Sequence, residues 1–210
     1  AANLVDLAKT SVFVYTGQGV NPIFNQAVLA GNFRPRADLG LPAGFIEADD
    51  ARPDFFLTGP VVTRTDNGST SDLRMLAGFF TSQTAPIPAY RPDEMRLIRA
   101  EANLRAATPD IPAALTDLNA VRTQRAGDPF GVNASLTAYS GALTVDALLL
   151  EVYKQRSIEL FMSGLRLDDS RRFGRPAPPA SLAERSRNFY PYPQQERIHN
   201  PGNIPADPAI

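Results

Sequence analysis

The sequence contains no cysteine and no tryptophan, and it has a single histidine, His199. Without cysteine there are no disulfides, no thiolate metal sites and no cysteine nucleophile. A zinc site usually draws on several histidine or cysteine ligands, which this chain does not have. A Ser-His-Asp hydrolase would have to use His199, and the Gly-x-Ser-x-Gly segment of such enzymes is missing. We therefore expect no catalytic residues and no metal site, and we expect His199 on the surface.

Net charge and long apolar runs are also lacking. The formal charge of −1 gives no electrostatic reason to expect nucleic acid or an anionic membrane surface as a partner. No window approaches the roughly 20 consecutive apolar residues of a membrane-spanning helix, and the first residues do not form a signal peptide. The glycines at 17 and 19 are too few for a phosphate-binding loop. We expect no cofactor.

What the chain does have is the composition of a globular protein, with 43% hydrophobic and 20% charged residues. Its 19 prolines are unevenly placed, which predicts long loops around a smaller helical centre. We expect a mainly α fold, in which long irregular loops and a few short strands wrap tetratricopeptide-like helical hairpins. A loop-rich segment, residues 1–91, would pack with a helical region, residues 92–210, as one domain.

Two predicted helices form a hairpin in the middle of the chain. Residues 92–107 begin with Pro92, which suits a first-turn position, and acidic residues follow at the positive end of the helix dipole. The partner helix spans residues 112–126 and ends at Gly127. Two antiparallel helices of this length resemble one tetratricopeptide unit.

Residues 143–174 lie within the longest stretch without proline and predict a third helix. Thr144 is placed to cap its first turn. Apolar residues recur on more than one of its sides, which indicates a helix packed between neighbours. Gly164 permits a stop, and a short charged helix should follow until Gly174.

Short strands are expected in the first segment, at residues 11–15 and 61–65, where β-branched and aromatic residues gather. Residues 65–71 are expected to form a hairpin turn or an exposed loop. Asp66, Asn67 and Gly68 also suggest a calcium loop, but the closing glutamate of such a loop is absent. The turn is the favoured interpretation.

Three blocks of sequence, in order, resemble the SusD/RagB family. The first comprises Arg99, Glu101, Ala102, Ala114, Leu118, Asn119, Val121, Arg122, Arg125 and Ala126. The second comprises Arg156, Glu159, Leu160, Gly164, Arg166, Asp169, Arg171, Arg172 and Gly174. The third comprises Tyr192, Pro193, Glu196, Asn200 and Pro201. Asp50 and Arg52 also match an Asp-x-Arg element of the family, whereas Gln155 stands where a glutamate is usual.

The resemblance implies a non-catalytic protein that captures a nutrient, either a glycan (oligosaccharide) or a peptide, at the surface of a Gram-negative cell. Its implied partner is a SusC-like, TonB-dependent outer-membrane barrel, over which the lipoprotein closes as a lid. Family members are much longer and carry a lipidated cysteine. We therefore expect this chain to be a C-terminal portion, held at the outer membrane only through a lipid anchor outside it.

The ionisable residues of these blocks admit two interpretations. Paired carboxylates near arginines suit glycoside hydrolysis, but arginine forks also bond carboxylates between packed helices, and we favour such ion pairs. The resemblance assigns the following residues to the scaffold: Glu101, Asn119, Arg122, Arg156, Glu159, Gly164, Arg166, Asp169, Arg172, Gly174 and Glu196. The proline-rich tail should be extended across the helices, anchored by Tyr190 and Tyr192.

Ligand contacts are harder to assign. Loop aromatic and arginine residues are the candidates, although packing is the favoured role for each: Phe24, Phe33, Phe45, Tyr90, Tyr139, Arg34, Arg36 and Arg64. A competing interpretation of the whole chain is a tetratricopeptide-like structural or interaction subunit of another membrane or surface assembly, whose groove holds a peptide or a subunit.

Overall fold

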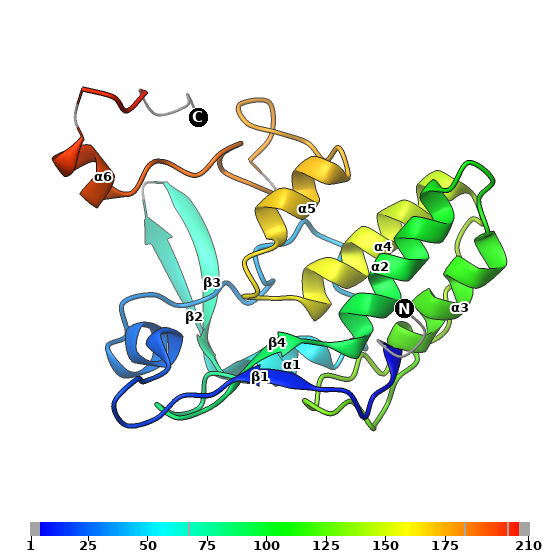
Figure 1. The fold of residues 1–210 in the computed structure, drawn as a ribbon, viewed down its shortest axis with the longest axis horizontal. Coiled ribbons are helices and arrows are strands. Elements are labelled where there is room, and N and C mark those ends of the chain that lie inside the picture. Colours follow the sequence, from blue (N-terminus) through cyan, green and yellow to red (C-terminus); the bar gives the residue numbers. More distant parts are fainter. Residues whose placement is uncertain (1–4, 67, 183, 201, 206–210) are drawn as a thin grey trace. The chain divides into compact units, whose positions relative to one another are not determined.

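The computed structural model describes residues 5–66, 68–182, 184–200 and 202–205 (Figure 1). The chain forms two compact units, residues 1–161 and 162–210. The prediction of a mainly α protein with a few short strands is confirmed. The predicted division at residue 91 stays a prediction. Within the described part of the chain, no helix combines the length and the apolar character that crossing a membrane requires.

Three helices make the helical layer of the first unit: α2 (Pro92–Arg105), α3 (Ile111–Arg122) and α4 (Val145–Glu159). Helix α2 packs against both α3 and α4 (Figure 1). The three predicted helices are confirmed, but α3 ends before the predicted residue 126. The reason is the returning loop, because the main-chain oxygen of Arg122 accepts a hydrogen bond from the nitrogen of Leu136 at 2.8 Å.

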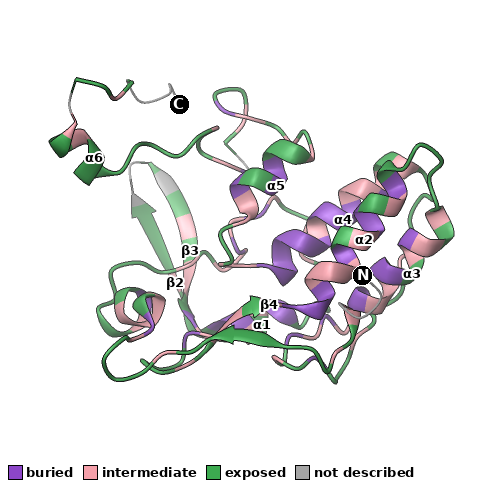
Figure 2. Ribbon diagram, in the orientation of Figure 1, coloured by how far each residue is buried: buried purple, intermediate pink, exposed green. Residues whose placement is uncertain are grey.

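The helix starts follow from the sequence. The side chain of Asp110 accepts from the nitrogen of Ala113 at 3.0 Å, and that of Thr144 accepts from Ala147 at 3.3 Å, so both α3 and α4 are capped. In α4, every residue from 155 to 159 is buried (Figure 2). The helix therefore lies between neighbours on all sides at this end, as its apolar pattern predicts.

Two antiparallel strand pairs complete the first unit. Strand β1 (Ser11–Phe13) pairs with β4 (Ile87–Tyr90). Strand β4 was not predicted from the sequence, because Pro88 lies inside it. Strands β2 (Leu57–Asp66) and β3 (Ser69–Leu76) pair as an antiparallel hairpin. The predicted strand at residues 61–65 lies within β2, whereas β3 was not predicted, and both strands extend into the segment 65–71 that was expected to be a turn or loop. Asn67, one of the three residues of the calcium-loop interpretation, lies outside the described residues.

The apolar core joins the loops to α4. Its buried cluster comprises Leu39, Leu41, Phe56, Leu57, Val132 and Ile158. Helix α1 (Arg52–Phe56) supplies Phe56, whose ring meets Phe161 edge-on at 5.5 Å between centroids. The short helix η2 (Phe24–Leu29) lies in the irregular segment before this core. Loops around a helical centre are thus the observed arrangement of this unit.

The second unit contains α5 (Arg166–Arg172) and α6 (Gln194–His199). Helix α5 lies between Gly164 and Gly174, as predicted, and both glycines have positive φ, +86° and +61°. The expectation of a wholly extended tail is wrong. Pro193 is the residue before α6, and the six residues of α6 are free of proline, so the chain can turn helical there.

The exposed fractions of Tyr190 and Tyr192 are 67% and 46%. Their role as anchors of the tail stays a prediction. His199 is exposed, as expected.

Candidate functional site

Arg52, the first residue of α1, has a completely buried side chain. Its Nε and Nη2 donate to the two carboxylate oxygens of Asp50 at 2.9 and 2.6 Å. The same guanidinium reaches α4, with Nη1 donating to Glu159 at 3.2 Å and Nη2 to the Gln155 side-chain oxygen at 2.7 Å. Burial opposes the charge of Arg52, but the neighbouring carboxylates outweigh it, and its pKa is raised.

The contacts continue along α4 to α3. Gln155 Nε2 donates to Glu151 at 2.8 Å, and Glu151 accepts from Arg122 Nη1. Arg122 also donates to both carboxylate oxygens of Glu47, at 2.6 and 3.0 Å. At the other end, Arg91 donates to the carboxylate and to the main-chain oxygen of Glu159. We call this set the buried charge network: Glu47, Asp50, Arg52, Arg91, Arg122, Glu151, Gln155 and Glu159. All of its members are buried except Glu47, whose side chain is 43% exposed.

The network joins α1, α3 and α4 through hydrogen-bonded ion pairs, which is a structural arrangement. Each of its carboxylates accepts a hydrogen bond from an arginine, and Glu151 and Glu159 are 5% and 1% exposed. A glycosidase needs two carboxyl groups on either side of an open sugar site. These two face arginines inside the protein, which supports a structural role for Arg122 and Glu159.

Asp93 is a buried carboxylate next to this network, in the first turn of α2. Burial, together with the charges of Glu159 and Asp128, raises its pKa to about 7. Its Oδ1 lies 3.2 Å from Arg96 Nε. The sequence indicates only a favourable helix-dipole position for Asp93, because its burial depends on tertiary packing.

The remaining predicted scaffold residues of the first unit lie outside this network. Glu101 accepts from Arg105 Nε at 2.7 Å, one turn further along α2. The side chain of Asn119 accepts from the nitrogen of Tyr139 at 2.7 Å and so fixes the loop after α3. Arg156 is buried on α4.

In the second unit, the predicted residues stay close to α5 and α6. Asp169 accepts from Arg172 Nη2 at 2.5 Å within α5, and Arg166 is the first residue of that helix. Glu196 is exposed on α6, where its carboxylate accepts from the Asn200 side chain at 3.3 Å.

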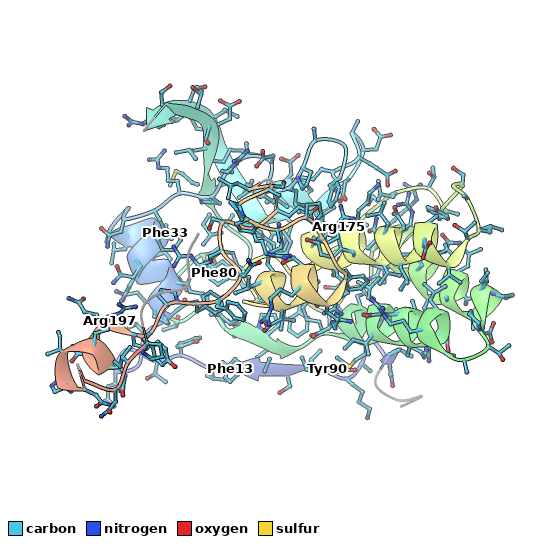
Figure 3. The ribbon with its side chains drawn as sticks, turned by 90° about the horizontal axis from the view of Figure 1, so that it is seen from above. Phe13, Phe33, Phe80, Tyr90, Arg175 and Arg197 are labelled. Atoms are coloured by element: carbon cyan, nitrogen blue, oxygen red, sulfur yellow. The ribbon has the colours of Figure 1, made fainter. Side chains whose placement is uncertain are left out.

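Among the candidate ligand contacts, several aromatic rings are used in packing. Phe45 meets the buried ring of Tyr153 edge-on at 6.1 Å between centroids. The ring of Tyr139 lies under the guanidinium of Arg122 at 6.0 Å. Tyr90 ends strand β4, and Phe24 begins η2. Phe33 is 43% exposed (Figure 3).

Of the three candidate arginines, Arg36 lines a surface hollow of about 260 Å³ beside strand β3. We call it the β3 hollow, and its lining residues are Arg36, Ala37, Asp38, Thr70, Ser71 and Asp72. The sequence pointed to Arg36 but not to the other lining residues. They meet through a β-bridge between Arg36 and Leu73, and such a pairing leaves no local sequence signal.

Comparison with known proteins gives a family match and a structural similarity. A family model described as the SusD family matches residues 79–207, more than half of the chain. Among solved structures, the chain is similar to a SusD superfamily protein from Bacteroides fragilis, with a TM-score of 0.50 and 16% sequence identity. The similarity covers 76% of this chain but only 39% of that protein, and at this identity it concerns the fold alone. No curated protein matches the chain.

Proposed function

The chain belongs to the SusD family, and on this premise we propose that it takes part in the non-catalytic capture of a nutrient at the cell surface. The nutrient is a glycan or a peptide, and the capture serves a TonB-dependent outer-membrane transporter of a Gram-negative bacterium. The observation that carries the proposal is the family match over residues 79–207.

The local chemistry supports binding rather than catalysis. The carboxylates of the buried charge network are engaged by arginines, and they stabilise the frame on which the loops are held. Among the residues that the structure describes, no three histidine, cysteine or acidic side chains are grouped to hold a metal ion. The proposed partner is a SusC-like barrel, and the proposed membrane attachment is a lipid anchor outside this chain.

The test is a gentle extraction of the protein from its native cells, followed by identification of all proteins that co-purify and by the intact mass of the chain. We expect a large β-barrel transporter to co-purify with a longer, lipid-bearing chain. Recovery of the protein in another assembly, without a transporter, would contradict the proposal.

A second candidate function is a tetratricopeptide-like structural or interaction subunit of another membrane or surface assembly. The observation that favours it is the packing of α2 against α3, two helices joined by a short connection. The same purification separates the two proposals, because an interaction subunit would bring down a stable protein partner other than a transporter.

A further inference from the structure

The β3 hollow is built from two segments that are distant in sequence. Residues 35–37 run antiparallel to β3, with the nitrogen of Ala37 donating to the oxygen of Asp72 at 2.7 Å and that of Arg74 to Pro35 at 3.1 Å. Strand β3 is therefore hydrogen-bonded on both sides, to β2 and to this segment. Backbone hydrogen bonds therefore hold the two segments that carry the lining residues in a fixed register.

The floor of the segment is anchored in the apolar core. Leu39 and Leu41 directly follow the lining residues, and each is only 4% exposed. Leu39 has a φ of +56°, a conformation that is unfavourable for a bulky side chain. Such backbone strain persists only where the surrounding structure imposes it, and burial of Leu39 supplies that constraint. The turn that carries Arg36 and Asp38 is thus fixed before any ligand arrives.

Arg36 and Asp38 form a double hydrogen bond on this turn. Arg36 Nε donates to Asp38 Oδ1 at 3.0 Å and Nη2 to Oδ2 at 2.6 Å, while the nitrogen of Gly40 also donates to Oδ1 at 2.8 Å. Both side chains are about half exposed, at 52% and 46%. Their orientation is set, yet their outer edges face water.

The remaining lining residues are small or polar. Asp72 Oδ1 accepts from Thr63 at 2.6 Å, which orients the carboxylate. Thr70 and Ser71 add hydroxyl groups, and Ala37 is the apolar member of the lining. One guanidinium and two carboxylates leave the hollow with a slight excess of negative charge, which disfavours an anionic ligand.

We propose that the β3 hollow is a subsite for one sugar ring of a neutral oligosaccharide, with Arg36 donating to one ring hydroxyl and Asp72 accepting from its neighbour. Each hydroxyl of a sugar both donates and accepts, so a cation and a carboxylate that line the same hollow suit a vicinal diol. The volume of about 260 Å³ is smaller than a pocket for a whole drug-sized ligand, which is why one ring is assigned. This inference rests on the proposed nutrient capture and names the class of its ligand.

The experiment uses the protein with its complete native chain. An array of neutral plant and animal oligosaccharides, with hexagalacturonate as the acidic probe and a casein digest as the peptide probe, identifies what binds. Isothermal titration then measures the affinity of the best neutral oligosaccharide for three variants. Arg36→Gln and Asp72→Asn each remove one charged contact, and Arg34→Gln is the matched control, because this exposed arginine lies outside the lining.

We expect the two hollow variants to bind at least about tenfold more weakly, as for a lost hydrogen bond to a charged group, and Arg34→Gln to bind like the unmodified protein. Melting curves check that all three variants are folded. Equal binding by every variant would overturn the subsite and leave the proposed function intact. Binding of only the casein digest or only hexagalacturonate would overturn the neutral-sugar class. If no probe binds while a transporter still co-purifies, the subsite is overturned and nutrient capture stands.

Discussion

The chain uses the same ion pair in two different environments. Arg52 with Asp50 and Arg36 with Asp38 are both arginine–aspartate pairs two residues apart, and each is joined by Nε and Nη2 to the two carboxylate oxygens. The side chains of the first pair are both 0% exposed, whereas those of the second are 52% and 46% exposed. The two pairs therefore share their hydrogen-bond geometry but differ in how far they are buried.

The difference shows what burial demands of a charge. Arg52 without water needs further partners, and it finds them in Gln155 and Glu159. Removing one member of such a set leaves the others charged and buried, which is strongly destabilising. Arg36 keeps contact with water, so its pair adds little stability and its outer edge stays available to a ligand.

The largest expected effect comes from Arg52→Met, which leaves Asp50 and Glu159 buried without this cation. We expect the free energy of unfolding to fall by about 3–5 kcal/mol, measured by urea denaturation at pH 7. Arg36→Met is the matched control. A loss as large in the control as in Arg52→Met would break the comparison between the two pairs.

A smaller loss is expected for Gln155→Glu, which restores the residue usual in the family pattern. The Gln155 amide nitrogen donates to Glu151 at 2.8 Å, and a carboxylate there would face a like charge instead. We expect a loss on the order of 1–3 kcal/mol at pH 7. Urea denaturation measures it, and equal stability of variant and parent would contradict the arrangement of the network.

Asp93 sharpens the comparison through pH. Its pKa is about 7 in the folded protein and 3.8 as the ordinary value, so between these pH values the folded state binds more protons than the unfolded state. Stability contributed by Asp93 therefore falls as the pH rises from about 4 to 7, by at most about 1.4 kcal/mol per pH unit. The difference in unfolding free energy between the parent and Asp93→Asn, measured from pH 4.5 to 8, should change with this sign. A pH-independent difference would exclude a buried, titrating Asp93.

The smallest effect is expected for Arg36→Gln, which removes a half-exposed pair. The free energy of unfolding should change by less than about 1 kcal/mol, and less still in high salt. The same variant tests the β3 hollow, so a near-native unfolding midpoint together with lost sugar binding would separate the binding role of Arg36 from folding.

Local sequence signals predicted α2, α3, α4 and the short helix α5. Asp110 and Thr144 are caps that act within one turn, and Gly164 and Gly174 act on their own backbone, so such features are visible without tertiary structure. Strand β4 was hidden by Pro88, and α6 by the prolines that precede it. In both cases, proline correctly indicated irregular chain nearby, but the regular element extended closer to the proline than the sequence suggested.

The sites depended on contacts that no local pattern contains. The sequence shows Asp50 and Arg52 as a motif, but it does not indicate that Arg52 donates hydrogen bonds to Glu159 and Gln155. Likewise, Arg36 was one candidate among several until the β-bridge to Leu73 brought the hydroxyls of β3 beside it. Pairing between distant segments decides which charged residues are buried and which remain exposed.

The span of the buried charge network also has a consequence for the order of folding. Arg52 donates hydrogen bonds to residues that follow it by 103 and 107 positions, so these are contacts of long sequence separation. Contacts of this sequence separation form slowly, because a long loop must close before they give any stabilisation. Local helices such as α2 and α3 can form early, whereas the loop around α1 must wait for α4. The hydrogen bonds of the network should therefore form late in the folding of the first unit, and their formation should set the rate of the slow phase of refolding.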